Sequence, residues 1–156
     1  MKEKRLLKHD FKWVPPHERK SRFPGMDKPH RIGPLEKRKP LLWVIRSKPV
    51  EMKSDLFLIN DSEEILEEVV SSSGGFASTN DDIIPATSKS KVIYNDVQPG
   101  EAVKIEEYEL VFDSDFVLSV SLKIKSKNFG EIELSTPSVK GGIREAVLMW
   151  DTEDTN

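Results

Sequence analysis

Short apolar runs separated by turn-forming residues follow one another from residue 41 to residue 150. The clearest run covers residues 116–124, where apolar side chains occupy every second position and mostly polar ones lie between them. Alternate side chains of a strand point to opposite faces of a sheet. The pattern therefore predicts a strand with one face in a core and the other largely in solvent.

Two earlier runs, residues 41–46 and 55–60, are apolar at successive positions instead of alternate ones. Their length and composition predict strands, and their continuous apolarity predicts that both faces of each strand are buried. Further strands are expected, with turn signals between them, at residues 91–94, 102–105, 108–112, 131–134 and 143–150.

Residues 62–70 fit two structures. A serine followed by two glutamates resembles a helix start, and the apolar residues between 65 and 70 would share one helical face. The serine and glycine run at 71–75 gives poor support to a helix longer than two turns, so a strand over residues 65–72 is favoured. Residues 77–90, rich in Ser, Thr, Asn and Asp, are predicted to form a long loop.

Pro99 and Gly100 stand at the two central positions of a type II turn, and Glu101 follows them. A strand opened by such a Pro-Gly-Glu turn resembles the immunoglobulin-like sandwiches of bacterial and cytosolic proteins, over about residues 41–150. The resemblance concerns the fold alone, since the Cys and Trp positions of true immunoglobulin domains are missing. The sequence therefore predicts an all-β protein: an antiparallel immunoglobulin-like sandwich of about eight short strands.

Charge divides the chain near Pro40. The first 50 residues hold 15 Lys and Arg against 5 Asp and Glu, whereas the rest hold 9 against 22. Seven of the ten prolines also lie in the first 50 residues, and proline favours extended backbone. We therefore predict a basic, Pro-rich, extended or disordered arm over residues 1–40, an acidic sandwich over residues 41–150 and a disordered acidic tail over residues 151–156.

Location is inferred from what the sequence lacks. Its first residues do not contain the apolar stretch of a secretory signal, and no run approaches the ~18 apolar residues of a membrane span. The absence of cysteine excludes disulfides and thiol nucleophiles. We expect a soluble cytoplasmic protein; in a nucleated cell the basic run at residues 37–40 would resemble a nuclear localisation signal.

Aromatic residues within the basic arm suggest that it docks, either on its own acidic domain or on a partner. The predicted function is a non-enzymatic protein-binding module of the adaptor, inhibitor or immunity type, without a cofactor. Clustered glutamates of the sandwich would add a negative face that recognises a basic protein. Because aromatics dominate interface energetics, the expected anchors are Trp13, Phe23 and Trp43. The expected electrostatic contacts are Arg19, Arg22, Lys37, Arg38 and Lys39.

Other functions stay open at this point. The basic arm could neutralise phosphates while its aromatics stack on bases, which would make the protein nucleic-acid-associated. Loop aspartates could gather calcium or act as paired carboxylates in hydrolysis, and the weak candidates are Asp81, Asp82, Asp113 and Asp115. The three histidines lie on the arm without metal-ligand spacing, so no metal site is predicted from them. A free sheet edge could also pair two copies into a dimer.

Overall fold

A computed structural model describes residues 3–7, 11–15, 38–79, 82–85, 91–111 and 113–151, apart from the side chains of residues 75–79 and 82–85. Every regular element in these ranges is a strand, and the strands form two antiparallel sheets. Sheet A has the order β1 (Arg5–Leu6), β7 (Ala102–Glu109), β3 (Lys53–Asn60), β2 (Pro40–Arg46) and β11 (Glu145–Trp150). Sheet B is built on β4 (Leu66–Thr79) and β8 (Val117–Ser126); β5 (Asp82–Pro85) and β6 (Val92–Val97) pair with β4, and β9 (Gly130–Ser135) and β10 (Val139–Lys140) pair with β8.

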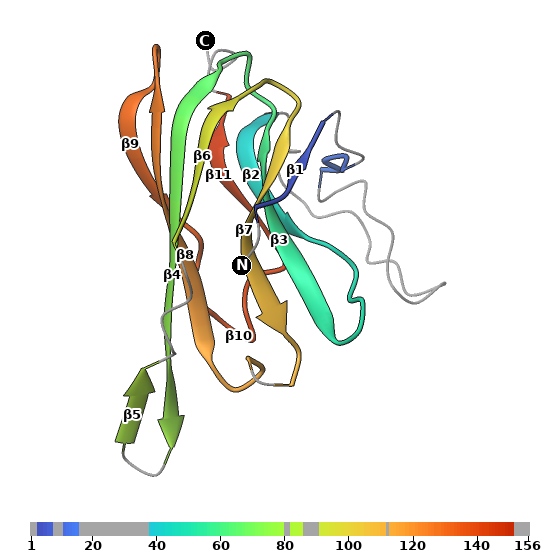
Figure 1. Cartoon of the computed structure of the whole chain (residues 1–156), viewed down its shortest axis with the longest axis vertical. Helices are drawn as coiled ribbons and strands as arrows, with labels where there is room; N and C mark the ends of the chain where they lie inside the picture. Colours follow the sequence, from blue (N-terminus) through green and yellow to red (C-terminus); the bar gives the residue numbers. More distant parts are fainter. Residues whose placement is uncertain are drawn as a thin grey trace, which may run out of the picture.

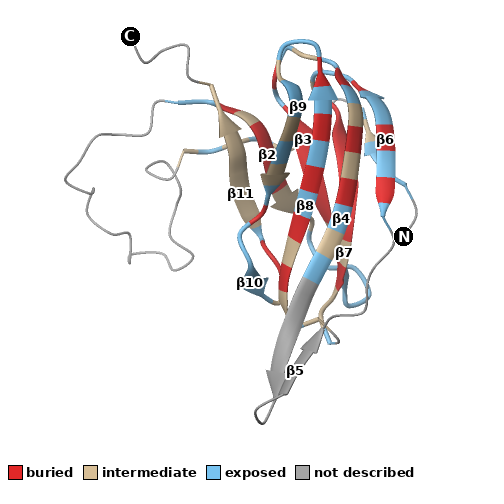
Figure 2. Cartoon of the chain, turned by 90° about the vertical axis from the view of Figure 1, so that its left-hand side faces the viewer, coloured by how far each residue is buried: buried red, intermediate tan, exposed pale blue. Residues whose placement is uncertain are grey.

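The two sheets pack face to face around a shared apolar core (Figure 1). Sheet A contributes residues such as Leu42 and Leu58, and sheet B contributes residues such as Val69 and Leu122, all of them fully buried. Figure 2 shows buried and exposed positions alternating along β8, as the sequence predicts for residues 116–124. The all-β prediction is confirmed, and the two-layer arrangement is that of a sandwich.

Local signals were accurate at two further places. The turn at residues 98–101 has Gly100 at a φ of 83° and a hydrogen bond from the Glu101 N–H to the Gln98 carbonyl of 3.0 Å. Positive φ at the third residue is what a type II turn requires of glycine. The stretch with two possible structures is a strand, since β4 begins at Leu66.

Three sequence predictions are wrong in detail. Residues 77–90 are not one long loop, because β4 continues to Thr79 and pairs with β5 from Phe76↔Pro85 to Thr79↔Asp82. In Figure 1 this hairpin reaches beyond the rest of the sandwich. Residues 108–112 are not a separate strand, because β7 runs unbroken to Glu109. The last strand begins at residue 145 instead of 143, after a turn in which Gly141 and Gly142 both have positive φ.

The N-terminal segment, defined here as residues 3–7 and 11–15, lies against sheet A (Figure 1). It falls within the predicted arm of residues 1–40, whose middle part, residues 16–37, lies outside the described residues. The predicted tail beyond Asp151 also lies outside them. Within the described ranges, no helix is long and apolar enough to cross a membrane.

Candidate functional site

One part of the outer face of sheet A is apolar, like the face toward the core. Trp43 of β2, Phe57 and Ile59 of β3 and Ala102 of β7 form a second buried cluster, separate from the core between the sheets. Their strand neighbours point the other way into the main core, because successive side chains alternate between faces. The prediction that residues 41–46 and 55–60 are buried on both faces is therefore confirmed for the centres of β2 and β3.

The N-terminal segment covers this outer cluster. Leu6, Phe11 and Trp13 pack against it. The ring centroids of Phe11 and Phe57 are 5.4 Å apart, and Trp13 meets Trp43 edge-on at 5.7 Å. Such tilted and edge-on contacts add about 0.5–1.5 kcal/mol each beyond the burial of apolar area.

Trp13 lies between two other tryptophans. Its ring meets Trp150 of β11 edge-on at 5.6 Å, and the Arg38 guanidinium lies 4.4 Å from the Trp150 ring centroid. The Trp43 indole N–H donates to Asp61 Oδ2 at 2.6 Å, which fixes the ring that Trp13 contacts. These three tryptophans, Trp13, Trp43 and Trp150, form an aromatic cluster that joins the N-terminal segment to the last described strand.

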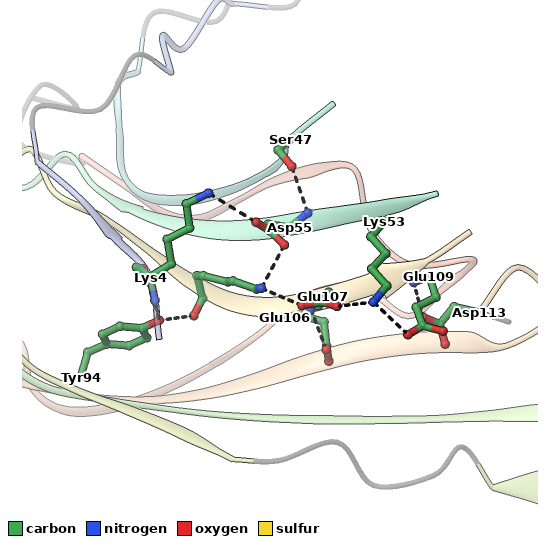
Figure 3. Close-up of polar contacts among 10 residues, drawn as sticks. Lys4, Ser47, Lys53, Asp55, Tyr94, Glu106, Glu107, Glu109 and Asp113 are labelled. Atoms are coloured by element: carbon green, nitrogen blue, oxygen red, sulfur yellow. Dashed lines mark hydrogen bonds and ion pairs between the residues drawn. The ribbon is translucent and has the colours of Figure 1, made fainter. Parts of the chain in front are cut away.

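Backbone pairing holds the segment at the edge of sheet A. β1 pairs with β7 in the register Arg5↔Val103 and Leu6↔Ala102, and the Lys104 N–H donates to the Lys4 carbonyl at 2.9 Å. Next to this bond, the side chain of Tyr94 bridges the backbones of the two strands (Figure 3). The Tyr94 hydroxyl of sheet B accepts from the Lys4 N–H at 3.0 Å and donates to the Lys104 carbonyl at 2.6 Å.

Tyr94 thus ties three elements together: β6 of sheet B, β7 of sheet A and the N-terminal segment. Its side chain is buried, and burial raises the pKa of the phenol, so the hydroxyl stays protonated and can donate. Arg5 supports the same junction, because its guanidinium donates to the carbonyls of Asn95 at 2.8 Å and Asp96 at 3.2 Å. Carbonyls at the rim of β6 are in this way covered by the segment.

A row of alternating charges occupies the other half of the outer face (Figure 3). The ammonium of Lys104 lies 3.1 Å from Asp55 Oδ1 and 2.7 Å from Glu107 Oε2. Lys4 extends the row beyond Asp55 at 3.7 Å, and Lys53 extends it beyond Glu107 at 3.8 Å. Every charge in this row faces an opposite charge.

Burial opposes the charge of Lys104, but the hydrogen bonds to Glu107 and Asp55 outweigh it and raise the pKa of the ammonium. The same bond from Lys104 lowers the pKa of Glu107 against the effect of burial. Both groups are therefore charged at neutral pH. A permanently protonated lysine is a poor nucleophile or base, so this arrangement suits a structural ion network.

The edge of β7 beyond β1 is covered by side chains. The Glu107 N–H donates to the Glu106 carboxylate at 2.8 Å, and the Glu109 N–H donates to Asp113 Oδ2 at 2.7 Å. Carboxylates that occupy edge N–H groups block the addition of another strand. At this edge, the pairing position left to an extended segment is the one that β1 occupies.

A groove of about 960 Å³ opens beside the aromatic cluster. Its lining includes the apolar residues Trp13, Pro15 and Phe129 and the charged residues Arg38 and Glu63. Pro15 and Arg38 are also the described residues that flank residues 16–37. Both ends of that connection therefore lie at one groove.

The described members of the predicted partner-binding set are placed as follows. Trp43 is fully buried, and Trp13 is partly buried against it, so both are engaged within the chain. Arg38 is exposed and stacks on Trp150, and the carbonyl of exposed Lys39 accepts from the Asp151 N–H at 2.9 Å. The other predicted contacts lie outside the described residues: Arg19, Arg22, Phe23 and Lys37.

The aspartates proposed as weak metal ligands do not come together where the structure describes them. Asp113 binds a backbone N–H, and Asp115 is exposed. Asp81 and the side chain of Asp82 lie outside the described residues. Among the described side chains, no three His, Asp or Glu residues are close enough to hold a metal ion.

Not all of the clustered glutamates of the predicted negative face are at the surface. Glu101 and Glu106 are buried, and Glu107 and Glu109 belong to the ion row. Glu68 pairs with Lys125 across sheet B at 3.9 Å. Glu63 and Glu67 are exposed.

Sequence reasoning missed three contributors: Tyr94, Lys104 and Trp150. One signal pointed toward the docked segment. Two strands apolar on both faces require a cover on each side, and the Phe11-Lys12-Trp13 alternation places two aromatics on one side of an extended backbone. No known family, no curated protein and no solved structure matches this chain.

Proposed function

We propose that this protein is a non-enzymatic protein-binding module, built on an immunoglobulin-like sandwich, whose docking site is the outer face of sheet A and the β7 edge beside it. The ligand class is an extended protein segment that carries aromatic side chains at alternate positions. The observation that carries the proposal is the chain's own N-terminal segment, which sits on this site as such a ligand would.

Three features of that contact support the proposal. Main-chain pairing at β7 gives affinity that is independent of sequence, while Leu6, Phe11 and Trp13 give specificity. The connection from Pro15 to the start of β2 at Pro40 is residues 16–39, which is 24 residues, whereas connections between elements usually have about 2–6 residues. A segment joined through so long a connection is held mainly by its own contacts, and an equivalent segment can make the same contacts.

Chain tracing supports the immunoglobulin-like part of the proposal. The chain crosses from one sheet to the other after β3, β6, β7 and β10. Repeated crossing of this kind is typical of Greek-key sandwiches. The ion row supports the non-enzymatic part, since its lysines and carboxylates are occupied by one another.

The test uses a labelled peptide that copies residues 3–15 and the full chain carrying Trp13→Ala. Removing Trp13 weakens the tethered segment, which otherwise competes at an effective concentration in the mM range. We expect the peptide to bind the variant at least about tenfold more tightly than the parent chain by fluorescence anisotropy. Leu7→Ala is the matched control, because Leu7 is 74% exposed and its loss should leave peptide affinity unchanged.

A Phe11→Ala chain provides a second test if Trp13→Ala unfolds, which thermal melting reveals. A peptide with both aromatics replaced by alanine should bind neither protein. Equal affinity of the natural peptide for the parent chain and for both folded variants would overturn the proposal, and so would equal binding of the alanine peptide.

A further inference from the structure

We infer that the docking site contains a subsite for the guanidinium of an arginine, and that its ligand segment carries this arginine directly before its first apolar anchor. The inference rests on the proposed function, because it adds a charged determinant to the aromatic ones of the same ligand. In the structure Arg5 of the N-terminal segment fills the subsite, and the anchor Leu6 follows it. Any extended segment that takes this position meets the same groups.

Two adjacent carbonyls of β6 form one side of the subsite. The Arg5 guanidinium donates through Nη2 to the Asn95 carbonyl at 2.8 Å and through Nη1 to the Asp96 carbonyl at 3.2 Å. Successive carbonyls of a regular strand point to opposite sides, but Asp96 has a φ of 52°. At a left-handed residue the carbonyls before and after the Cα point in similar directions, as they do along a helix, so both can reach one guanidinium.

A buried carboxylate supplies the negative charge of the subsite. Glu101 is 3% exposed, and its Oε1 lies 3.6 Å from Arg5 Nη1. The Gln98 N–H donates to the same oxygen at 2.7 Å and holds the carboxylate in place. Glu101 Oε2 is buried and has no hydrogen-bond donor among the described residues. A buried carboxylate is costly unless a cation lies beside it, and Arg5 provides this cation.

The arrangement favours arginine over lysine. A guanidinium is a planar fork that reaches several acceptors at once and stacks on aromatic rings, whereas an ammonium is a single point of charge. The Arg5 guanidinium also lies 5.7 Å from the Tyr94 ring centroid. Lys4 is held more loosely, because its ammonium lies 3.7 Å from Asp55 and 5.6 Å from the Phe57 ring centroid, and its side chain is 52% exposed. Selection for a basic residue therefore belongs to the position of Arg5.

Labelled peptides that copy residues 3–15 test this selection on the full chain carrying Trp13→Ala, by fluorescence anisotropy. We expect Arg5→Lys and Arg5→Ala in the peptide each to weaken binding at least about tenfold. Lys4→Ala is the matched control, since it removes the same charge and should weaken binding at most about threefold. An Arg5→Lys peptide that binds as tightly as the natural peptide would overturn the inference.

A change on the receptor side tests the carboxylate. Glu101→Gln, added to the Trp13→Ala chain, keeps the shape of the side chain and an acceptor for the Gln98 N–H but removes the charge. The natural peptide should bind this chain at least about tenfold more weakly, while the Arg5→Ala peptide should bind both chains about equally. A natural peptide that does not distinguish the two chains would contradict the role of Glu101 and overturn the subsite.

A pair of variants at Asp96 tests the carbonyls, and also serves if thermal melting shows that Glu101→Gln is unfolded. Asp96→Gly keeps a residue that adopts positive φ, whereas Asp96→Val introduces a β-branched residue that avoids it. The preference for the natural peptide over Arg5→Lys should persist in the glycine chain and fall at least about threefold in the valine chain. An equal preference in both folded chains would overturn the subsite.

Hydrogen exchange in the full chain gives a measurement without a peptide. The Lys104 N–H donates to the Lys4 carbonyl, so its exchange reports whether the segment is docked. Arg5→Lys should accelerate this exchange at least about fivefold, and an unchanged rate would overturn the subsite. Peptide binding without preference for arginine would leave the proposed function standing and remove the subsite. A natural peptide that binds no chain would contradict the proposed function, and the exchange rate then decides on the subsite alone.

Discussion

Replacing Tyr94 with phenylalanine tests how the N-terminal segment is held to the sandwich. The substitution keeps the buried ring and removes the hydroxyl that joins the Lys4 N–H to the Lys104 carbonyl. A neutral hydrogen bond contributes about 1 kcal/mol, and each buried group left without a partner costs about 1–3 kcal/mol. Because Lys4 lies at the exposed end of the segment, water can reach one of the two groups, and the expected loss is about 2 kcal/mol.

Urea unfolding and thermal melting measure this loss. For a chain of this size, about 2 kcal/mol corresponds to a decrease in Tm of roughly 6 °C. The effect should be local: hydrogen exchange at the Lys104 amide, which is bonded to the Lys4 carbonyl, should accelerate more than exchange at the centre of β8. Ile93→Val on the exposed side of β6 is the control. A Tyr94→Phe chain within about 0.5 kcal/mol of the parent would refute the reasoning.

Three other substitutions or conditions give direct tests. Burial raises the pKa of Tyr108 to about 12, whereas an unfolded tyrosine ionises near pH 10. The free energy of unfolding should therefore stay constant up to about pH 10 and fall by up to about 3 kcal/mol toward pH 12. Urea titrations of a Tyr108→Phe chain should show a smaller loss. Gly142 has a φ of 92°, and a Cβ at this position would meet the Tyr108 ring, so Gly142→Ala should lower the free energy of unfolding by about 3 kcal/mol. Gly130→Ala, whose Cβ meets open space, should lower it by about 1 kcal/mol. Equal losses for the two variants would contradict this packing. The pKa of Glu107 is lowered in the folded chain, so its ionised carboxylate stabilises the fold at pH values above its ordinary pKa of about 4.5, and this stabilisation is lost as the pH falls below that value. Lys104→Met should abolish this acid-dependent loss and lower the free energy of unfolding at neutral pH by about 2 kcal/mol.

The strands that could be predicted from sequence are those whose signals are local. Residues 116–124 alternate strictly, and the Pro99-Gly100 pair sets its own turn, so neither depends on distant partners. The β4–β5 hairpin was missed because its Ser, Thr and Asn residues are typical of loops. β5 pairs with the end of β4, and the preceding part of β4 pairs with β8; composition does not reveal such pairing.

The docking site could be predicted from the sequence only in part. Continuous apolarity in β2 and β3 predicted that both faces are covered, but the covering residues lie more than 25 positions away. Trp43 was predicted to be an interface anchor because aromatics dominate interface energetics. In the structure it is fully buried, and Trp13 of the same chain packs against it. Sequence reasoning identified the right residue types, and topology decided which of them face each other.

Contact between Trp13 and Trp150 has a consequence for the order of folding. During synthesis the N-terminal segment leaves the ribosome well before β11, yet its aromatic pocket is complete only after β11 has joined β2. The loop closed by this contact contains most of the described chain, so its formation carries a high entropic cost and comes late. Until then Phe11 and Trp13 are exposed on a basic segment, and a nascent chain in this state is open to chaperones and to neighbouring chains on the same messenger RNA.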